Sequence, residues 1–347
     1  MAASASNATS FSTHSNANPS LSFNTPIRTL KPFSICPKPP LSLQIQSPPS
    51  NSSLKCSSST HLLHPTAGAS RPASLKSRLA AGETLYGIFL LGFSPTLAEI
   101  AGLAGYDFAV IDMEHGPGGI SDALPSLHAL AATGTPSILR VPESTETWAK
   151  KALDLGPQGI MFPMIEGPKS ARKAVSYCKF PPDGIRGSAH PLVRASKYGI
   201  DDGYLENYQD ELLIMCQVET EDAAKKIDEI AAVDGVDCVQ MGPLDLSASL
   251  GYLWEPGHKK VREMLQAAEK KVLETKKGAF LSGFAMAHDS PEQLRMRGYH
   301  MVSGAVDIGL FRSAAVADVA RFKKCLEEAA RQEGAEDGRG EDGYWSE

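Results

Sequence analysis

Charged and polar side chains stand where apolar, strand-like runs of this sequence end. The apolar run that begins at Phe108 ends in Asp112, Glu114 and His115. Arg140 stands at the end of the following apolar run, at 135–142. An imidazole beside carboxylates can move protons, and a guanidinium can hold a carboxylate or stabilise an oxyanion. The sequence therefore places acid–base and anion-stabilising groups at equivalent positions of successive runs.

Two later runs also end in carboxylates. Glu219 closes Gln217-Val218-Glu219, and Asp245 closes Gly242-Pro243-Leu244-Asp245. Hard divalent cations such as Mg²⁺ and Mn²⁺ prefer oxygen ligands, and two carboxylates plus two substrate oxygens would suit them. A salt-bridged pair, or a short helix capped by Asp245, explains the same pattern. From the pattern alone, metal binding and capping are about equally supported.

Arg140 and His115 also have a structural interpretation. Arg140 could be a buried arginine in a structural ion pair. A lone histidine near a strand end is more often structural than catalytic. Asp112 could hold the imidazole of His115 and make it a general base, which favours the catalytic interpretation only modestly.

Short apolar runs alternate with helix-like stretches from Thr84 onward. The runs are almost continuously apolar, which indicates strands that are covered on both faces. Eight such runs predict an α/β fold with a closed (β/α)₈ TIM barrel, in which the C-terminal ends of the strands build the active site. An open doubly wound sheet would show a glycine-rich phosphate turn after the first strand, and Gly92-Phe93-Ser94-Pro95 is not one. The predicted strands are 84–92, 108–114, 135–142, 159–165, 212–219, 238–242, 278–285 and 301–306.

Helix-like stretches are predicted at 94–104, 147–155, 220–232, 258–276 and 290–297. Ser94-Pro95 and Ser290-Pro291 each place a capping residue before a first-turn proline, and Thr220 caps a first turn that contains acids. The Gly/Pro-rich loop at 180–187 could lie over the site or pack as a rigid connector.

The first 77 residues differ in composition from the remainder. No Asp or Glu precedes Glu83, and the segment is rich in Ser, Thr, Asn and Pro with scattered Lys and Arg. This composition predicts a disordered transit peptide at 1–77 that directs the protein to a chloroplast rather than a mitochondrion. The alternative is a disordered Ser/Pro-rich linker that carries no targeting signal. We then expect a single barrel domain at 78–330 and an acidic flexible tail at 331–347.

The formal net charge of −6 argues against a nucleic-acid partner, because such partners are bound by basic surfaces. No apolar run is long enough to span a bilayer, so we expect no membrane partner. The six cysteines form no CxxC pair and receive no catalytic or metal-binding role.

Taken together, the strand-end motifs resemble those of the HpcH/HpaI class II aldolases, in particular a plant plastid-type member similar to 2-oxo-3-deoxy sugar-acid aldolases. The resemblance extends from about Leu85 to about Phe322. It implies a carbon–carbon lyase that reversibly cleaves a 4-hydroxy-2-oxo acid to pyruvate and an aldehyde through a metal-bound enolate. The motifs are Ile111-Asp112-Met113-Glu114-His115, Arg140-Val141-Pro142, Leu153-Asp154-Leu155-Gly156, the 181–187 loop, Gln217-Val218-Glu219 and the stretch from Gly242 to Gly251.

The resemblance also implies roles for single residues. Glu219 and Asp245 would bind Mg²⁺ or Mn²⁺. Arg140 would stabilise the enolate oxygen and orient pyruvate, and His115, oriented by Asp112, would move protons. Asp154 would support the site, within the chain or from a neighbouring subunit. The remaining implied substrate-binding residues are Glu114, Gln217, Gly242, Pro243 and Leu244.

The family commonly forms trimers or hexamers with exchanged C-terminal helices, and the stretch 309–326 is compatible with that assembly. Met113 replaces a glycine that is often found at this place in the family. This change would narrow the pocket or repack the barrel. The seventh and eighth predicted strands, at Gly283-Phe284-Ala285-Met286 and Ser303-Gly304-Ala305-Val306-Asp307, also differ from bacterial sugar-acid aldolases and could contribute to aldehyde selection, so the acceptor aldehyde is left open.

Two other functions stay open. An acyl-CoA lyase of the citrate-lyase-β branch would need a basic phosphate-binding patch, and the sequence shows no clear one. A catalytically silent barrel that acts as a binding protein is disfavoured because every expected charged group is present. A Schiff-base aldolase would need a lysine at a strand end, and none of the eight predicted strands ends in one.

Overall fold

Eight parallel strands pair in sequence order and close on themselves in the computed structural model, which describes residues 73–275 and 278–337. The barrel is closed because β1 pairs with both β2 and β8. The predicted TIM barrel is therefore confirmed, and each predicted run contains one strand. The strands are β1 (Leu85–Leu90), β2 (Phe108–Asp112), β3 (Ser137–Arg140), β4 (Gly159–Phe162), β5 (Leu213–Val218), β6 (Cys238–Met241), β7 (Phe280–Phe284) and β8 (Met301–Val306).

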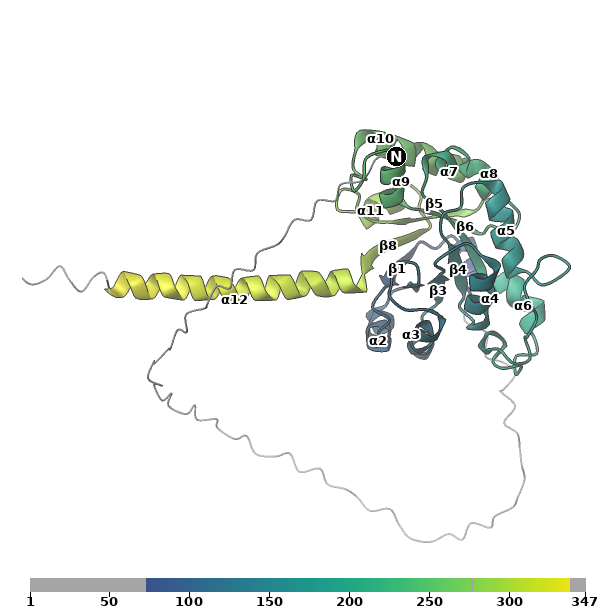
Figure 1. Cartoon of the computed structure of the whole chain (residues 1–347), viewed down its shortest axis with the longest axis horizontal. Coiled ribbons are helices and arrows are strands. Elements are labelled where there is room, and N and C mark those ends of the chain that lie inside the picture. The colour runs from purple at the N-terminus through teal and green to yellow at the C-terminus, as the bar shows by residue number, and fades with distance from the viewer. Residues whose placement is uncertain (1–72, 276–277, 338–347) are drawn as a thin grey trace, which may run out of the picture. The chain divides into compact units, whose positions relative to one another are not determined.

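Helices connect the strands and surround the barrel (Figure 1). The elements that return the chain between strands are α2 (Pro95–Ala104), α3 (Ile120–Thr133), α4 (Glu146–Asp154), α5 (Pro168–Cys178), η1 (Arg194–Ser196), α6 (Tyr204–Glu211), α7 (Glu221–Lys225), α8 (Ile227–Ala231), α9 (Pro243–Ser249), α10 (Lys259–Glu274) and α11 (Pro291–Met296). Before and after the barrel stand α1 (Leu75–Ala80) and α12 (Asp307–Asp337). None of the described helices is both long enough and apolar enough to cross a bilayer.

The predicted helix starts are confirmed by their caps. The side chains of Ser94, Thr220 and Ser290 each accept a hydrogen bond from a backbone amide of the following turn. The helix predicted at 220–232 is divided at Lys226 into α7 and α8. α3 and α5 were not predicted, because each begins after a glycine that offers no side-chain cap.

Two groups of buried side chains fill the fold. One lies between the strands and the surrounding helices, and the other fills the barrel interior. In the interior group, Leu75 and Leu79 of α1 are buried with Leu85, Phe108 and Met161 of the strands. Lys76 of α1 also lies 2.9 Å from a carboxylate oxygen of Asp237, which precedes β6. α1 therefore belongs to the barrel domain.

This packing moves the predicted start of the domain. The boundary predicted after residue 77 falls inside α1, so the folded part begins before residue 78. Residues 1–72, which carry most of the predicted transit peptide, lie outside the described residues, and the chloroplast address stays a prediction. The tail predicted from residue 331 overlaps α12, which runs to Asp337, and residues 338–347 also lie outside the described part.

The Gly/Pro-rich loop at 180–187 packs as a connector in this chain. It follows α5 and precedes β5, which places it at the N-terminal ends of the strands, opposite the ends that carry the charged motifs. Arg186 is buried there, with its guanidinium carbon 4.7 Å from the Phe180 ring centroid and Nη2 3.7 Å from Asp154 Oδ1. The alternative position over the site of the same chain is therefore wrong.

The buried position of Leu75 gives a stability prediction. Leu75→Ala removes a fully buried side chain from the barrel interior, and such truncations cost about 2–5 kcal/mol. We expect urea denaturation of the full chain to show a loss of this size. Leu192→Ala is the matched control, because the same change at a side chain that is 79% exposed should cost about 0.5 kcal/mol or less. Equal losses in the two variants would contradict the assignment of α1 to the core.

Candidate active site

A cavity opens where the C-terminal ends of the strands meet, which we call the mouth of the barrel. One wall is polar and comes from the ends of β2, β3, β5 and β6, and the other is apolar and comes from β1, β7 and β8. This is the place where barrels of this type carry their active sites. The residues that line it are Phe89, Leu91, Asp112, His115, Arg140, Gln217, Gln240, Met241, Gly242, Pro243, Leu244, Asp245, Phe284, Met286 and Val306.

A buried ion pair joins the ends of β2 and β3. Asp112 and Arg140 are register partners of the two strands. Arg140 donates from Nε to Asp112 Oδ1 at 2.9 Å and from Nη2 to Oδ2 at 2.5 Å, so the contact is bidentate. The guanidinium carbon also lies 5.1 Å from the Phe89 ring centroid. Burial alone would lower the pKa of Arg140, but Asp112 and Glu114 raise it above its ordinary value, so the positive charge is permanent.

His115 is oriented differently from the prediction. Asp112 Oδ1 accepts hydrogen bonds from the backbone N–H groups of Glu114 and His115, at 3.0 and 3.4 Å, but not from the imidazole. The imidazole Nε2 instead lies 3.8 Å from Glu114 Oε2, and the His115 side chain is 59% exposed. The predicted pairing of Asp112 with the imidazole is therefore wrong, because Arg140 takes both oxygens of that carboxylate.

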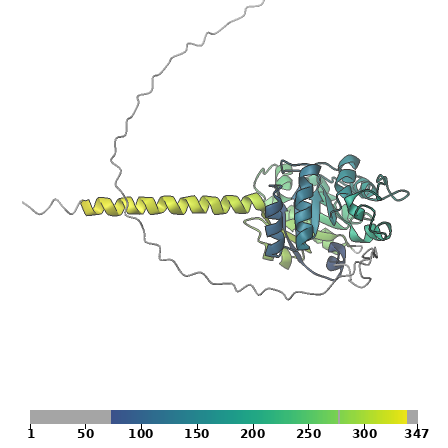
Figure 2. The ribbon, with the colours of Figure 1, turned by 90° about the horizontal axis from the view of Figure 1, so that it is seen from below.

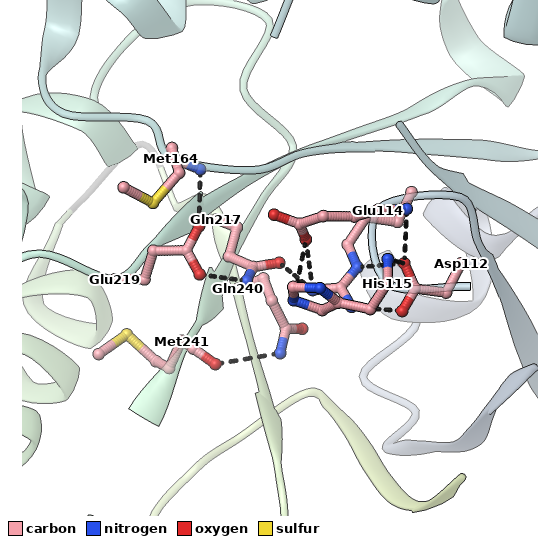
Figure 3. A network of polar contacts seen from close by, with 9 residues as sticks. Asp112, Glu114, His115, Met164, Gln217, Glu219, Gln240 and Met241 are labelled. Atoms are coloured by element: carbon pink, nitrogen blue, oxygen red, sulfur yellow. Dashed lines mark hydrogen bonds and ion pairs between the residues drawn. The ribbon is translucent and has the colours of Figure 1, made fainter. Parts of the chain in front are cut away.

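Glu114 contacts both the guanidinium of Arg140 and the imidazole of His115 through the same oxygen, Oε2; Figure 3 shows its carboxylate beside His115. Its Oε2 lies 2.8 Å from Arg140 Nη1, but without hydrogen-bond geometry, and that buried oxygen has no hydrogen-bond partner among the described residues. Burial raises the pKa of Glu114 to about 7 against the lowering effect of Arg140, and the charges of Asp112 and Asp245 raise it further. The carboxyl can therefore gain or lose a proton near neutral pH.

Gln217 links the guanidinium to Glu219. The Gln217 Oε1 atom accepts from Arg140 Nη1 at 3.3 Å, and its Nε2 donates to Glu219 Oε2 at 2.5 Å. The backbone N–H of Met164, which follows β4, donates to Glu219 Oε1 at 2.7 Å (Figure 3). Met164 holds a φ of 50°, which a residue other than glycine rarely adopts. Both oxygens of Glu219 are thus held in place.

Gly242 has a steric reason to be a glycine. A Cβ atom at this position would lie 2.7 Å from Cβ and 2.8 Å from Oε2 of Glu219. Its N–H donates to the backbone carbonyl of Val218 at 3.0 Å, and Pro243 has no N–H. The Gly242 amide is therefore not available to a substrate carboxylate, although Gly242 was predicted to bind substrate. The amides of Leu244 and Asp245 are left for that role.

Asp245 faces Glu219 across the end of β6 without a protein partner. It lines the cavity and is exposed, and its carboxylate makes no hydrogen bond or ion pair within 73–275 and 278–337. The N-cap position of α9 is Gly242, so the interpretation of Asp245 as a cap is not supported. Burial raises the pKa of Glu219, and the like charges of Glu114 and Asp245 raise it further.

A divalent cation fits this set of carboxylates. A cation beside Glu219 and Asp245 would relieve their repulsion, and both present hard oxygen atoms. No group of three or more His, Cys, Asp or Glu side chains in the described part of the chain could hold a metal ion. Two protein oxygens would therefore leave coordination positions for water and substrate.

Asp154 does not reach this site within the chain. It is the last residue of α4 and lies at the opposite end of the barrel, beside Arg186. In contrast, the structure adds Gln240 and Ser282, which the sequence analysis missed. Ser282 Oγ donates to Gln240 Oε1 at 2.6 Å, and both residues are buried. A polar residue inside an apolar run was the signal that could have revealed Gln240, the register partner of Gln217.

The carboxyl of Glu114 predicts a pH-dependent stability. Its pKa in the folded protein, about 7, lies above the ordinary value of 4.5, so its contribution to stability is greatest below pH 4.5 and is lost as the pH rises through 7. We expect Glu114→Gln, measured by thermal unfolding in EDTA, to raise Tm relative to the unsubstituted protein more at pH 8.5 than at pH 5.5. Glu143→Gln, which removes an exposed carboxylate, is the control. The same difference in Tm at both pH values would contradict this prediction.

The chain resembles known proteins in sequence over most of its described length. Residues 85–314 match the family model described as HpcH/HpaI aldolase/citrate lyase. The chain is 36% identical over 249 residues to the 2-keto-3-deoxy-L-rhamnonate aldolase of Escherichia coli (strain K12), which covers 72% of this chain and 92% of that enzyme.

Solved structures agree with the sequence match. An HpcH/HpaI aldolase/citrate lyase family protein from Burkholderia cenocepacia J2315 superposes with a TM-score of 0.68 at 35% identity, covering 72% of this chain and 98% of that one. The HpcH/HpaI aldolase from Desulfitobacterium hafniense DCB-2 gives a TM-score of 0.66 at 27% identity, covering 72% and 97%. The chain therefore belongs to the HpcH/HpaI aldolase/citrate lyase family, and it is a lyase.

Proposed function

We propose that this lyase is a class II pyruvate aldolase that reversibly cleaves a 4-hydroxy-2-oxo acid of the 2-oxo-3-deoxy sugar acid type to pyruvate and an aldehyde. The observation that carries the proposal is the hydrogen-bonded chain from Arg140 through Gln217 to Glu219, which ends opposite the unpartnered carboxylate of Asp245. The name of the Escherichia coli relative supports the substrate class.

Glu219 and Asp245 would hold a divalent cation, Mg²⁺ or Mn²⁺. When bound, such a cation would draw electron density from the keto and carboxylate oxygens of the pyruvate half, which lowers the barrier to breaking the adjacent carbon–carbon bond. Met164 and Gln217 hold Glu219 in one orientation, so they position a ligand rather than contact the reacting atoms.

Arg140 supplies a fixed positive charge to the oxygen that becomes anionic. Its guanidinium is held by Asp112 on one edge, so little reorganisation is needed when charge develops. The apolar wall formed by Phe89 and Phe284, whose ring centroids are 5.6 Å apart, keeps one side of the cavity dry. A charge in such surroundings acts more strongly than it would in water.

His115 and Glu114 are the groups that can move the proton. Cleavage breaks the bond between C3 and C4, takes the proton from the C4 hydroxyl and finally adds a proton to C3, which becomes the methyl group of pyruvate. The exposed imidazole of His115 would accept the hydroxyl proton. Glu114 lies beside the imidazole and would share the proton with it, because its pKa of about 7 suits both states.

The other functions considered have less support. The described cavity carries one Lys or Arg side chain, Arg140, and Asp112, Glu114 and Gln217 already contact it. The phosphates of an acyl-CoA would find no free cation there. A silent barrel would not need the chain of buried contacts that holds Glu219.

We also propose that α12 packs against a second copy of this chain. From Leu310 to Arg331 its residues are exposed except Ala315, which is half-buried, and α12 extends away from the barrel helices (Figure 2). Apolar side chains recur along it at intervals of three or four residues, which is the pattern of a helix that buries one face. They are Ile308, Phe311, Ala315, Val319, Phe322 and Leu326, and all of them except the half-buried Ala315 are more than half exposed. A trimer or a hexamer would be built by such exchange.

Metal dependence is the first prediction from this function. We expect the protein to release pyruvate from 4-hydroxy-2-oxo acids in the presence of Mg²⁺ or Mn²⁺. EDTA should stop this pyruvate release, and adding the metal back should restore it. Glu219→Ala and Asp245→Ala should abolish both turnover and metal binding measured by calorimetry. Asp183→Ala, on the opposite side of the barrel, is the control for substitution of an exposed carboxylate. Full EDTA-sensitive turnover in either ligand variant would refute the metal assignment.

Assembly through α12 is tested by the size of the protein in solution. Phe311→Glu and Phe322→Glu place a charge in the proposed interface, and we expect light scattering to show a smaller particle at micromolar concentration. Lys324→Glu changes an exposed residue on the face of α12 opposite the apolar stripe and serves as the control. An unchanged mass in both phenylalanine variants would exclude this interface.

A further inference from the structure

A second cavity adjoins the mouth of the barrel. It shares Leu244 and Met286 with the cavity described above, so the two are continuous at these side chains. Its other walls come from the loop between α9 and α10 and from the loop between β7 and α11. The additional lining residues are Trp254, Glu255, Pro256, Gly257, His258, Ala287 and His288.

The first of these loops is held in an unusual conformation. Trp254 has a φ of 62°, and its side chain is 75% exposed at the cavity. A large side chain in the left-handed region is costly and persists where the surroundings enforce it. The ring of His258 stacks on Tyr252 with centroids 3.7 Å apart and planes 15° apart, and its Nδ1 accepts from the N–H of Lys260 at 3.3 Å. The rings of His258 and Tyr252 are thereby held in place at the rim of the second cavity.

The second loop is equally well fixed. Met286 and Asp289 exchange two backbone hydrogen bonds of 2.9 Å, which close a tight turn around His288. The carboxylate of Asp289 accepts two hydrogen bonds of 2.7 Å from Arg297. A Cβ atom on Gly257 would lie 3.3 Å from the His288 ring, so the two loops meet closely at this glycine. The backbones of both loops are therefore fixed, and they present exposed side chains, Trp254 and His288 among them, to the cavity.

The described lining of the second cavity offers an anion no permanent positive charge. The second cavity has one carboxylate, Glu255, and no Lys or Arg among its described lining residues. In the first cavity Arg140 is already contacted by Asp112, Glu114 and Gln217. A phosphate or a second carboxylate on the aldehyde half would thus meet carboxylates without a free cation, which costs binding energy.

We propose that the second cavity binds the distal part of an uncharged, hydroxylated acceptor aldehyde with a chain of four or more carbons. This inference rests on the proposed aldolase function and deepens it. Pyruvate and the aldehyde carbon occupy the first cavity, and the aldehyde chain passes Leu244 and Met286 into the second. The indole of Trp254 covers the C–H face of the chain, and the imidazoles of His258 and His288 bond its hydroxyl groups.

Condensation of pyruvate with matched aldehydes tests the proposal. The probes are glycolaldehyde, erythrose and erythrose 4-phosphate, each with Mg²⁺ or Mn²⁺. We expect kcat/KM for erythrose to exceed that for erythrose 4-phosphate by about tenfold or more, since a mismatched polar contact is worth at least that much in specificity.

Two variants and one control locate the effect. Trp254→Ala should lower the ratio of kcat/KM for erythrose to that for glycolaldehyde by about tenfold. His288→Lys should raise the use of erythrose 4-phosphate relative to erythrose, because it supplies the missing cation at an exposed position. Leu253→Ala is the control: this side chain is 68% exposed and does not line the cavity, so the ratios should stay unchanged.

The possible results separate this inference from the function on which it rests. Equal kcat/KM for erythrose and its phosphate, or an unchanged ratio in Trp254→Ala, would overturn the distal subsite while the aldolase function stands. Absence of product from every aldehyde, together with no pyruvate release from any 4-hydroxy-2-oxo acid, would overturn the aldolase function itself.

Discussion

The ion pair between Asp112 and Arg140 is the contact on which the arrangement of the site depends. Both groups are buried, and a buried charge without a partner is strongly unfavourable, so the two strand ends must bring them together. Once Arg140 is fixed by Asp112, its Nη1 donates to Gln217 and lies beside the carboxylate of Glu114. This contact fixes the orientation of the Gln217 side-chain amide, because its oxygen faces the guanidinium of Arg140 and its nitrogen faces Glu219.

The opposite end of that chain of contacts is a concentration of negative charge. Burial raises the pKa values of Glu114 and Glu219, and the negative charge of Asp245 raises both further, while the described cavity contains one permanent cation. Such a site is unfavourable for the folded protein by itself and becomes favourable when it binds a cation and an anionic substrate. The barrel can support it because its core is elsewhere, between strands and helices and in the layer closed by α1.

The sequence was informative where one physical rule acts alone. Continuous apolar runs predicted all eight strands, because strands buried on both faces require them, and the strand ends predicted which residues share the mouth. The sequence was less informative where two side chains could pair with the same carboxylate. Asp112 lies near both His115 and Arg140, and its carboxylate pairs with the guanidinium of Arg140 because that group is permanently charged. Asp154 shares a motif with the site in the sequence but ends a helix, which carries it to the far side of the barrel. α1 resembles the leader in composition, and that it belongs to the barrel domain is seen in the structure from the burial of Leu75 and Leu79.

The division of the mouth into two chemical halves follows from which strands end in which residues. β2, β3 and β5 bring Asp112, Arg140 and Gln217, and all the charge that would recognise the oxo acid of the proposed reaction lies on that side. β1, β7 and β8 end in Phe89, Phe284 and Val306, so the wall opposite has no group that could hold an anion. A substrate with one charged end and one uncharged end can be placed in such a site in one direction only. In the proposed reaction, the asymmetry of the barrel would therefore set the orientation of the substrate and with it the bond that is cleaved.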